Sequence, residues 1–200
     1  MRKLLPIMSL LLGLAATGCA SDTTGASLRN DFDAGVAAYD AGDYAKAYKI
    51  WSAIDDDDIA AMRNVAMMRR QGLGTAKDPK GAEDMYLRAA EAGLPTAQAD
   101  LADMLIRGEA GPPDFKRALP LLEAAAAANH PLAQYELAQF YEVGQQVPRN
   151  MAVARDLYAA AASHGMKEAK ARLDQLGQGS ADQAAQSPQA SPSEPPGTAR

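Results

Sequence analysis

The chain has 200 residues, of which 48% are hydrophobic, and a formal net charge of −5. This composition supplies enough apolar material for one globular or repeat domain, and it excludes a collagen-like or wholly disordered chain. The acidic balance, with no basic stripe along the sequence, argues against a nucleic-acid partner.

Residues 1–18 are predicted to be an export signal. Arg2 and Lys3 precede an apolar run from Leu4 to Ala16. A positive start followed by a short apolar segment is typical of a secretory signal, and the run is too short to span a membrane. These residues are therefore set apart from the fold.

Residues 16–19 resemble the bacterial lipobox, in which small residues precede a cysteine that is acylated and becomes the mature N-terminus. Cys19 is the only cysteine, so lipidation leaves no thiol for a disulfide. In a Gram-negative host, the resemblance also implies an outer-membrane lipoprotein facing the periplasm, because Ala20 rather than aspartate follows the cysteine. Ordinary signal cleavage after Ala20 is the alternative.

Small polar residues predict that 19–26 is the lipidated N-terminus with a short tether. Helical spacing of apolar residues on both sides of Gly42 then predicts a first helix pair. Next comes the acidic run 55–58, whose last member, Asp58, is placed to cap the following helix. The alternative, a cation site, fits less well because calcium loops alternate their ligands and include a glycine.

A step of 36 residues organises the centre of the chain. It separates Gly93, Asn129 and Gly165, residue types that tolerate the positive φ of a helix C-terminus. The same step separates three polar residues that each precede an amphipathic segment and are expected to be N-caps: Asp78, Asp114 and Asn150. It also separates four alanines for which close helix packing is the best explanation: Ala61, Ala97, Ala133 and Ala169. A fixed period in this range is typical of a stacked repeat array.

The residues of this period resemble the Sel1-like repeat family, which is related to tetratricopeptide repeats. The matching positions are Gly72, Gly74, Asp78, Ala82, Tyr86, Ala89, Ala90, Gly93, Ala97, Leu101 and Gly108. The resemblance implies an all-α solenoid of antiparallel helix pairs, about eight to nine helices, with a concave protein-binding face. The predicted repeat domain is 27–176, in units of about 27–78, 79–114, 115–150 and 151–176. The Gly-, Gln-, Ser- and Pro-rich residues 177–200 are predicted to be a disordered tail.

The residue inventory disfavours an enzyme. His130 and His164 are the only histidines, and no nucleophile set, metal-ligand spacing or phosphate-binding loop appears. No catalytic residue, metal or small-molecule cofactor is expected. Trp51, Tyr86 and Tyr158 lie in apolar stripes, which favours core packing over ligand contact.

The predicted function is therefore a non-enzymatic scaffold or adaptor, held at the cell envelope by lipid and binding envelope proteins through the solenoid groove. The candidate contact residues lie opposite the apolar stripes and, by family resemblance, line the groove: Lys49, Glu83, Arg88, Glu123 and Arg155. The alternative is an accessory lipoprotein that binds glycan or peptidoglycan through groove aromatics.

Overall fold

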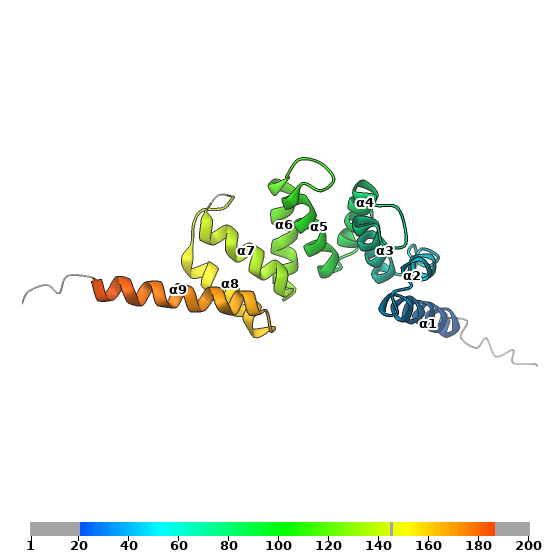
Figure 1. The fold of residues 1–200 in the computed structure, drawn as a ribbon, viewed down its shortest axis with the longest axis horizontal. Coiled ribbons are helices and arrows are strands. Elements are labelled where there is room, and N and C mark those ends of the chain that lie inside the picture. Colours follow the sequence, from blue (N-terminus) through cyan, green and yellow to red (C-terminus); the bar gives the residue numbers. More distant parts are fainter. Residues whose placement is uncertain (1–20, 145, 187–200) are drawn as a thin grey trace, which may run out of the picture.

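The computed structural model describes residues 21–144 and 146–186, and these residues form nine helices and no strand. The helices are α1 (Ser21–Asp40), α2 (Tyr44–Trp51), α3 (Ile59–Gln71), α4 (Pro79–Glu91), α5 (Pro95–Arg107), α6 (Phe115–Ala127), α7 (Pro131–Val143), α8 (Met151–Ser163) and α9 (Lys167–Gln186). They follow one another in an elongated, bent row with α1 at one end and α9 at the other (Figure 1). The predicted all-α solenoid is confirmed.

The predicted polar caps begin their helices. In each cap, a side-chain oxygen accepts a hydrogen bond from a backbone N–H in the first turn of the helix that follows. The four capping residues are Asp58, Asp78, Asp114 and Asn150. Three of these residues also donate their own N–H to a carbonyl of the preceding odd-numbered helix, as Asp78 to Arg69, Asp114 to Leu105 and Asn150 to Tyr141. Each long loop is therefore fixed at the same place in every repeat, which sets the register of the stack.

The predicted helix ends are also confirmed. Gly93 and Gly165 have φ of 87° and 89°, and Asn129, at the equivalent position, has φ of 62°. These residues follow α4, α8 and α6, where a left-handed residue lets the chain reverse into the next helix.

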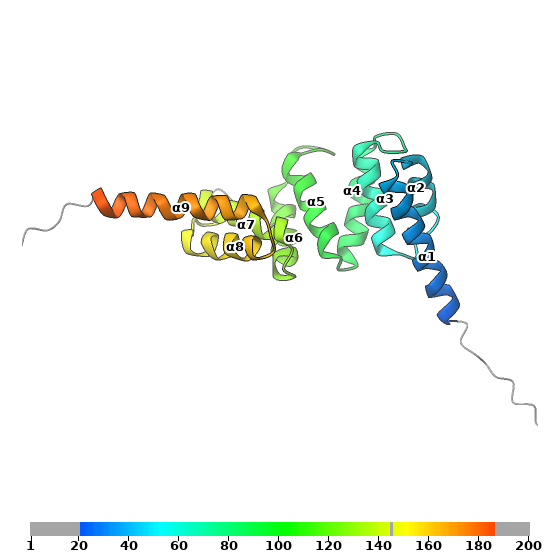
Figure 2. The same ribbon diagram turned by 60° about the horizontal axis from the view of Figure 1, so that its bottom comes forward.

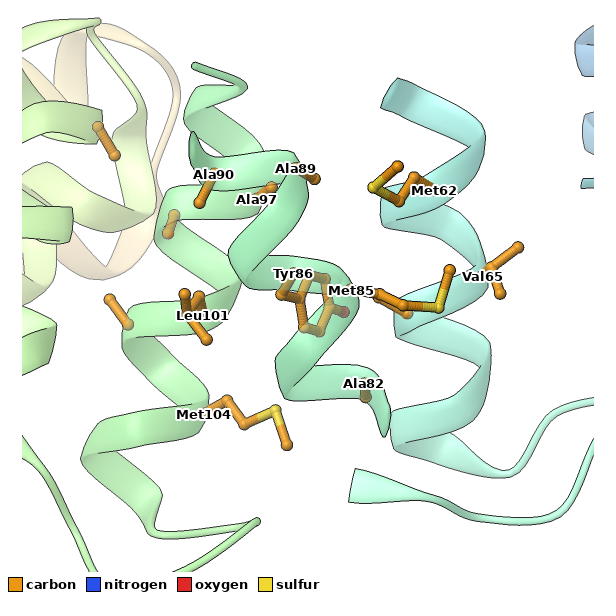
Figure 3. Packing of buried hydrophobic residues seen from close by; sticks show 14 of the residues in the cluster. Met62, Val65, Ala82, Met85, Tyr86, Ala89, Ala90, Ala97, Leu101 and Met104 are labelled. Carbon is orange, nitrogen blue, oxygen red and sulfur yellow. The ribbon is translucent and has the colours of Figure 1, made fainter. Parts of the chain in front are cut away.

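The core is built from small and large side chains in alternation. The four alanines in register, Ala61, Ala97, Ala133 and Ala169, are completely buried, as close helix approach requires. Around them pack larger residues: Met85 of α4 points toward α3, and Leu101 and Met104 of α5 flank Tyr86 (Figure 3). Trp51, Tyr86 and Tyr158 are at most 2% exposed, so their assignment to the core is confirmed.

The core has a boundary within α7. Leu137 belongs to the cluster of buried residues that extends from α1, whereas the neighbouring Ala138 belongs to a second cluster with α8 and α9. Helix α7 thus contacts both parts of the core on different sides.

Both ends differ from the prediction. Helix α1 begins at Ser21, inside the expected tether, and α9 continues to Gln186, inside the expected tail. The α9 extension contains no proline before Pro188, and the alanines and glutamines of 181–186 are good helix formers, whereas Gly177 and Gly179 at its start are poor ones. At the other end, α1 projects from the body of the solenoid (Figure 2). Its first residues include Ser21 and Asp22, types that favour helix N-termini.

Cys19 and the predicted signal 1–18 lie outside the described residues. Within the described ranges, no helix combines the length and the apolar character needed to cross a membrane.

A proline lies inside α6, at Pro120, where it has no backbone N–H to donate to the helix. The helix still begins directly after its cap, in register with the equivalent helices.

Candidate functional site

Helices α3 and α5 are joined by partly buried ion pairs. Arg63 Nε donates to Asp100 Oδ2 at 2.6 Å. In the last turn of α3, Arg70 contacts both Asp103 of α5 and Glu109 of the following loop, with its Nε 2.7 Å from Glu109 Oε2. These hydrogen bonds, that to Glu109 foremost, raise the pKa of Arg70 above its ordinary value. We call the surface formed by the odd-numbered helices α3, α5, α7 and α9 the odd-helix face.

At the C-terminal end of this face, α7 and α9 are joined by a second group of polar contacts. Glu142 of α7 pairs with Arg172 of α9 and accepts a hydrogen bond from the Tyr158 hydroxyl at 2.7 Å. The hydrogen bond from Arg172 holds the pKa of Glu142 below its usual range. Burial and the bond to Glu142 raise the pKa of Tyr158.

A recess of about 470 Å³ opens beside this ion pair, and we call it the C-terminal recess. Its lining is Tyr135, Gln139, Phe140, Glu142, Val143, Tyr158 and Arg172. The rings of Tyr135 and Tyr158 lie 5.5 Å apart, and Val143 is 59% exposed. The recess therefore combines aromatic rings, an exposed aliphatic side chain and hydrogen-bonding groups.

Between these two groups, Glu136 forms no ion pair with any residue of the described ranges, although the charges of Arg107 and Arg70 act on it. One of its carboxylate oxygens, Oε2, is buried and has no hydrogen-bond partner. Burial, together with the charge of Asp103, raises the pKa of Glu136 to about 7. The carboxyl group therefore keeps its proton to a higher pH than an ordinary glutamate does.

The predicted contact residues lie on the even-numbered helices and are spread over four of them. Lys49 on α2, Arg88 on α4, Glu123 on α6 and Arg155 on α8 are exposed. Arg88 Nη2 pairs with Asp56 at 2.9 Å, and Arg155 Nη2 donates to the carbonyl of Leu176 at 3.5 Å. The structure does not gather these residues into one cleft: of the recesses described, Lys49 lines one and Glu83 another.

Glu83 corrects the prediction of an open surface. It is only 7% exposed, and its carboxylate accepts a hydrogen bond from Arg117 Nη1 at 2.7 Å and lies 3.4 Å from Lys80 Nζ. Because Arg117 belongs to α6, this ion pair joins α4 to α6. Glu83 is thus part of the packing between even-numbered helices rather than of an open face.

The sequence reasoning missed Glu136 and the C-terminal recess. The available signal was a comparison of equivalent repeat positions: Asp100 and Glu136 are both acidic, whereas Ala99 stands one repeat step after Arg63. The histidines lie at turns: His130 precedes α7, with its Nδ1 buried and unpartnered, and His164 follows α8. Within residues 21–144 and 146–186, no group of three or more His, Cys, Asp or Glu side chains is arranged to hold a metal ion.

Stacked antiparallel helix pairs with caps and turns in one register define a tandem-repeat α-solenoid. The Sel1 repeat model matches three consecutive segments, 59–94, 95–130 and 131–166, and the chain belongs to the Sel1 repeat family. Each matched segment begins one helix earlier than the units drawn from the sequence, so that α3 pairs with α4, α5 with α6 and α7 with α8. A period alone does not fix where a unit begins.

Solved structures with the same fold support this assignment. A Sel1 repeat protein from Oxalobacter formigenes is 31% identical, with a TM-score of 0.68, over 71% of this chain and 58% of that one. The protein c5321, described as a protective antigen of uropathogenic Escherichia coli with an SLR fold, is 24% identical, with a TM-score of 0.68, over 77% of this chain and 34% of that one. The chain thus spans about three fifths and one third of these proteins. A search of curated proteins found no match.

Sel1 repeat proteins are generally protein-interaction scaffolds, and the solenoid fold is typically non-catalytic.

Proposed function

We propose that this protein is an adaptor of the bacterial cell envelope, anchored by acyl chains on Cys19 and binding an envelope protein through its solenoid. The observation that carries the binding role is the C-terminal recess, where the aliphatic side chain of Val143 is 59% exposed beside the rings of Tyr135 and Phe140. Aromatic side chains are enriched at the centre of protein interfaces, and tyrosine is among the residues that contribute most to binding when a partner excludes water from it.

Polar and charged side chains surround the apolar centre of the C-terminal recess. Gln139 is exposed, and the Glu142–Arg172 pair lies at the wall of the recess. An interface built on an apolar centre with satisfied polar groups at its edge excludes water without leaving a charge unpaired. The exposed residues Lys49, Arg88, Glu123 and Arg155 remain candidates for a second contact surface on the even-numbered helices.

Site-specific cross-linking in intact cells tests the binding surface. A photo-cross-linking amino acid at Val143 should give one discrete adduct with an envelope protein, and the same group at Glu123 serves as the matched control on the even-numbered helices. Adducts from Glu123 but not from Val143 would show that the partner binds the surface of the even-numbered helices. The absence of a discrete adduct from either position would contradict an adaptor role.

The anchor rests on residues 16–19, which resemble a lipobox, and on Cys19 as the only cysteine. Two or three acyl chains hold a protein firmly at a membrane, whereas one binds reversibly. Cys19→Ser should therefore release the protein from the membrane fraction and abolish incorporation of labelled palmitate. If the variant stays membrane-bound with unchanged mobility, the lipid anchor is wrong.

A glycan-binding role is the second candidate, and the aromatic lining of the C-terminal recess favours it. Tyr135 and Phe140 present rings beside the amide of Gln139, a combination that suits the apolar and hydroxyl-bearing sides of a sugar. Purified full-length protein incubated with isolated peptidoglycan should then be retained, and Tyr135→Ala should lose that retention. Retention that is unaffected by Tyr135→Ala would exclude the recess as the glycan site.

A further inference from the structure

The contacts between odd-numbered helices change along the solenoid. In the described part of the chain, ion pairs join α3 to α5 through Arg63 and Asp100, and α7 to α9 through Glu142 and Arg172. No ion pair in these ranges joins α5 to α7. The middle junction of the odd-helix face therefore lacks the link that its neighbours have.

The repeat explains why the link is absent. One step of 36 residues beyond Arg63 lies Ala99, and one step beyond Asp100 lies Glu136. The acidic partner is kept and the basic partner is replaced by alanine. Glu136 consequently holds a buried oxygen with no hydrogen-bond partner at the junction of α5 and α7, an arrangement that costs folding free energy when the carboxylate is charged.

The hydrophobic core is divided at the same helix. Leu137, next to Glu136, packs with the cluster that includes α3 to α6, and Ala138 packs with the cluster of α8 and α9. The weakened polar contact therefore lies on the helix at which the core passes from one cluster to the other, with Ala133 and Leu137 on the side of α1–α6 and Ala138 on the side of α8 and α9.

The charged groups around Glu136 come from several elements. Helix α5 contributes Asp100, Asp103 and Arg107, and α3 contributes Arg63 and Arg70. The two α3 arginines form ion pairs with Asp100, with Asp103 and with Glu109 of the loop after α5. Arg107 pairs with Asp103 on its own helix. His130 stands at the start of α7 itself. The neighbouring helices carry Lys116, Arg117 and Glu123 on α6, and Arg155, Asp156 and Tyr158 on α8. All of these are exposed except Tyr158, which is bonded to Glu142.

We propose that the junction of α5 and α7 is a proton-controlled joint, closed while Glu136 carries a proton and loosened when Glu136 ionises beside Asp103. Loosening would let α7, α8 and α9, with the C-terminal recess, change their position relative to α1–α6. The joint concerns the shape of the solenoid, so it goes beyond the proposed binding role and does not depend on it.

The raised pKa gives the direction of the effect. A carboxyl group whose pKa is about 7 in the folded protein favours its protonated form there, compared with a pKa near 4.5 in the unfolded chain. The stabilisation of the junction is therefore complete below pH 4.5 and is lost as the pH rises through about 7. His130 acts in the opposite direction, because burial lowers its pKa and its contribution is lost as the pH falls below its ordinary range.

Amide hydrogen exchange of the full chain in detergent tests the joint, with Glu136→Gln as the informative variant and Glu123→Gln, on the exposed side of α6, as its control. After correction for intrinsic exchange, the opening equilibrium of α7 in the wild type should rise by up to roughly tenfold per pH unit between about 5 and 7. Glu136→Gln should abolish this rise, Glu123→Gln should keep it, and α4 should show no comparable change. The same rise in Glu136→Gln and in the wild type would overturn the proposal.

A direct titration provides a second readout that does not need the variant to fold. The side-chain carboxyl carbon of Glu136, followed by NMR in the wild-type chain, should titrate near neutrality. A midpoint near 4.5 would overturn the proposal whatever the exchange measurements show. The Glu123 carboxyl in the same spectra serves as the internal comparison.

Discussion

Gly35 of α1 lies directly against the indole ring of Trp51 of α2. A Cβ atom at position 35 would overlap this ring, whose Nε1 donates a hydrogen bond to the carbonyl of Phe32 at 3.2 Å. Trp51 is 2% exposed, and its ring centroid lies 5.9 Å from that of Tyr39. The missing side chain of Gly35 is therefore what allows α1 to pack on the solenoid.

Replacement of Gly35 by alanine should destabilise the N-terminal helix pair. The added methyl group would force Trp51 or α1 to shift, and overpacking of this kind costs about 1–3 kcal/mol. Gly25→Ala is the matched control on the same helix, because a Cβ there meets nothing within 4 Å, and it should be neutral or stabilise by less than about 1 kcal/mol. Urea denaturation followed by Trp51 fluorescence measures both. Equal midpoints for the two variants would contradict the close contact.

Two glycines in the turns between helices provide a second pair of substitutions. Gly93 and Gly108 both have positive φ, but a Cβ at Gly93 meets nothing within 4 Å, whereas at Gly108 it would lie 2.7 Å from the carbonyl oxygen of Gly111. Gly93→Ala should therefore cost about 1–2 kcal/mol from backbone strain alone, and Gly108→Ala should cost more. Thermal unfolding in one buffer compares them, and a smaller loss for Gly108→Ala would contradict the predicted order.

Arginine substitutions separate structural from surface ion pairs. The side chains of Arg70 and Asp103 are 16% and 14% exposed, whereas those of Arg88 and Asp56 are 54% and 80% exposed. Arg70→Ala should lower the free energy of unfolding by about 1–3 kcal/mol, because Glu109 loses its cation and Asp103 keeps only the more exposed Arg107. Arg88→Ala should change it by less than about 1 kcal/mol. Similar losses for the two variants in urea denaturation would show that burial does not distinguish these pairs.

The elements set by neighbouring residues could be predicted from the sequence. Asp78 and Asn150 were identified as caps because a cap and the N–H groups it binds lie within one helical turn. Ala97 and Ala133 were identified as packing positions because their period is that of the stack itself. The capping hydrogen bonds and the packing alanines recur in every repeat unit, so the period of the sequence reveals them.

The candidate site was less predictable because its contacts connect different units. Glu83 belongs to the surface of an isolated α4, and only Arg117, in the next unit, buries and pairs it. The unusual state of Glu136 depends on the absence of an arginine at Ala99, on another helix. The start of α1 at Ser21 and the end of α9 at Gln186 also differ from the prediction, because the glycines and short polar residues of these stretches carry no local signal for a helix.

The pair formed by Glu142 and Arg172 makes a prediction about acid stability. Because the pKa of Glu142 is lowered in the folded protein, its contribution is fully present above pH 4.5 and is lost as the pH falls through the folded-state pKa. Arg172→Gln removes the main cause of that lowering, so it should cost about 1 kcal/mol at neutral pH. The difference from the wild type should shrink as the solution is acidified below the ordinary range of a glutamate.

Tyr158→Phe is the companion variant, because it removes only the hydroxyl that donates to Glu142 at 2.7 Å and leaves the aromatic packing in place. It should cost about 1–2 kcal/mol at neutral pH, and the loss of the double variant should differ from the sum of the two single losses, since both donors act on one carboxylate. Urea denaturation of the four proteins at neutral pH and near pH 3 measures these differences. Strict additivity, or an Arg172→Gln loss that is equally large in acid, would show that Glu142 does not couple α7, α8 and α9 as the structure indicates.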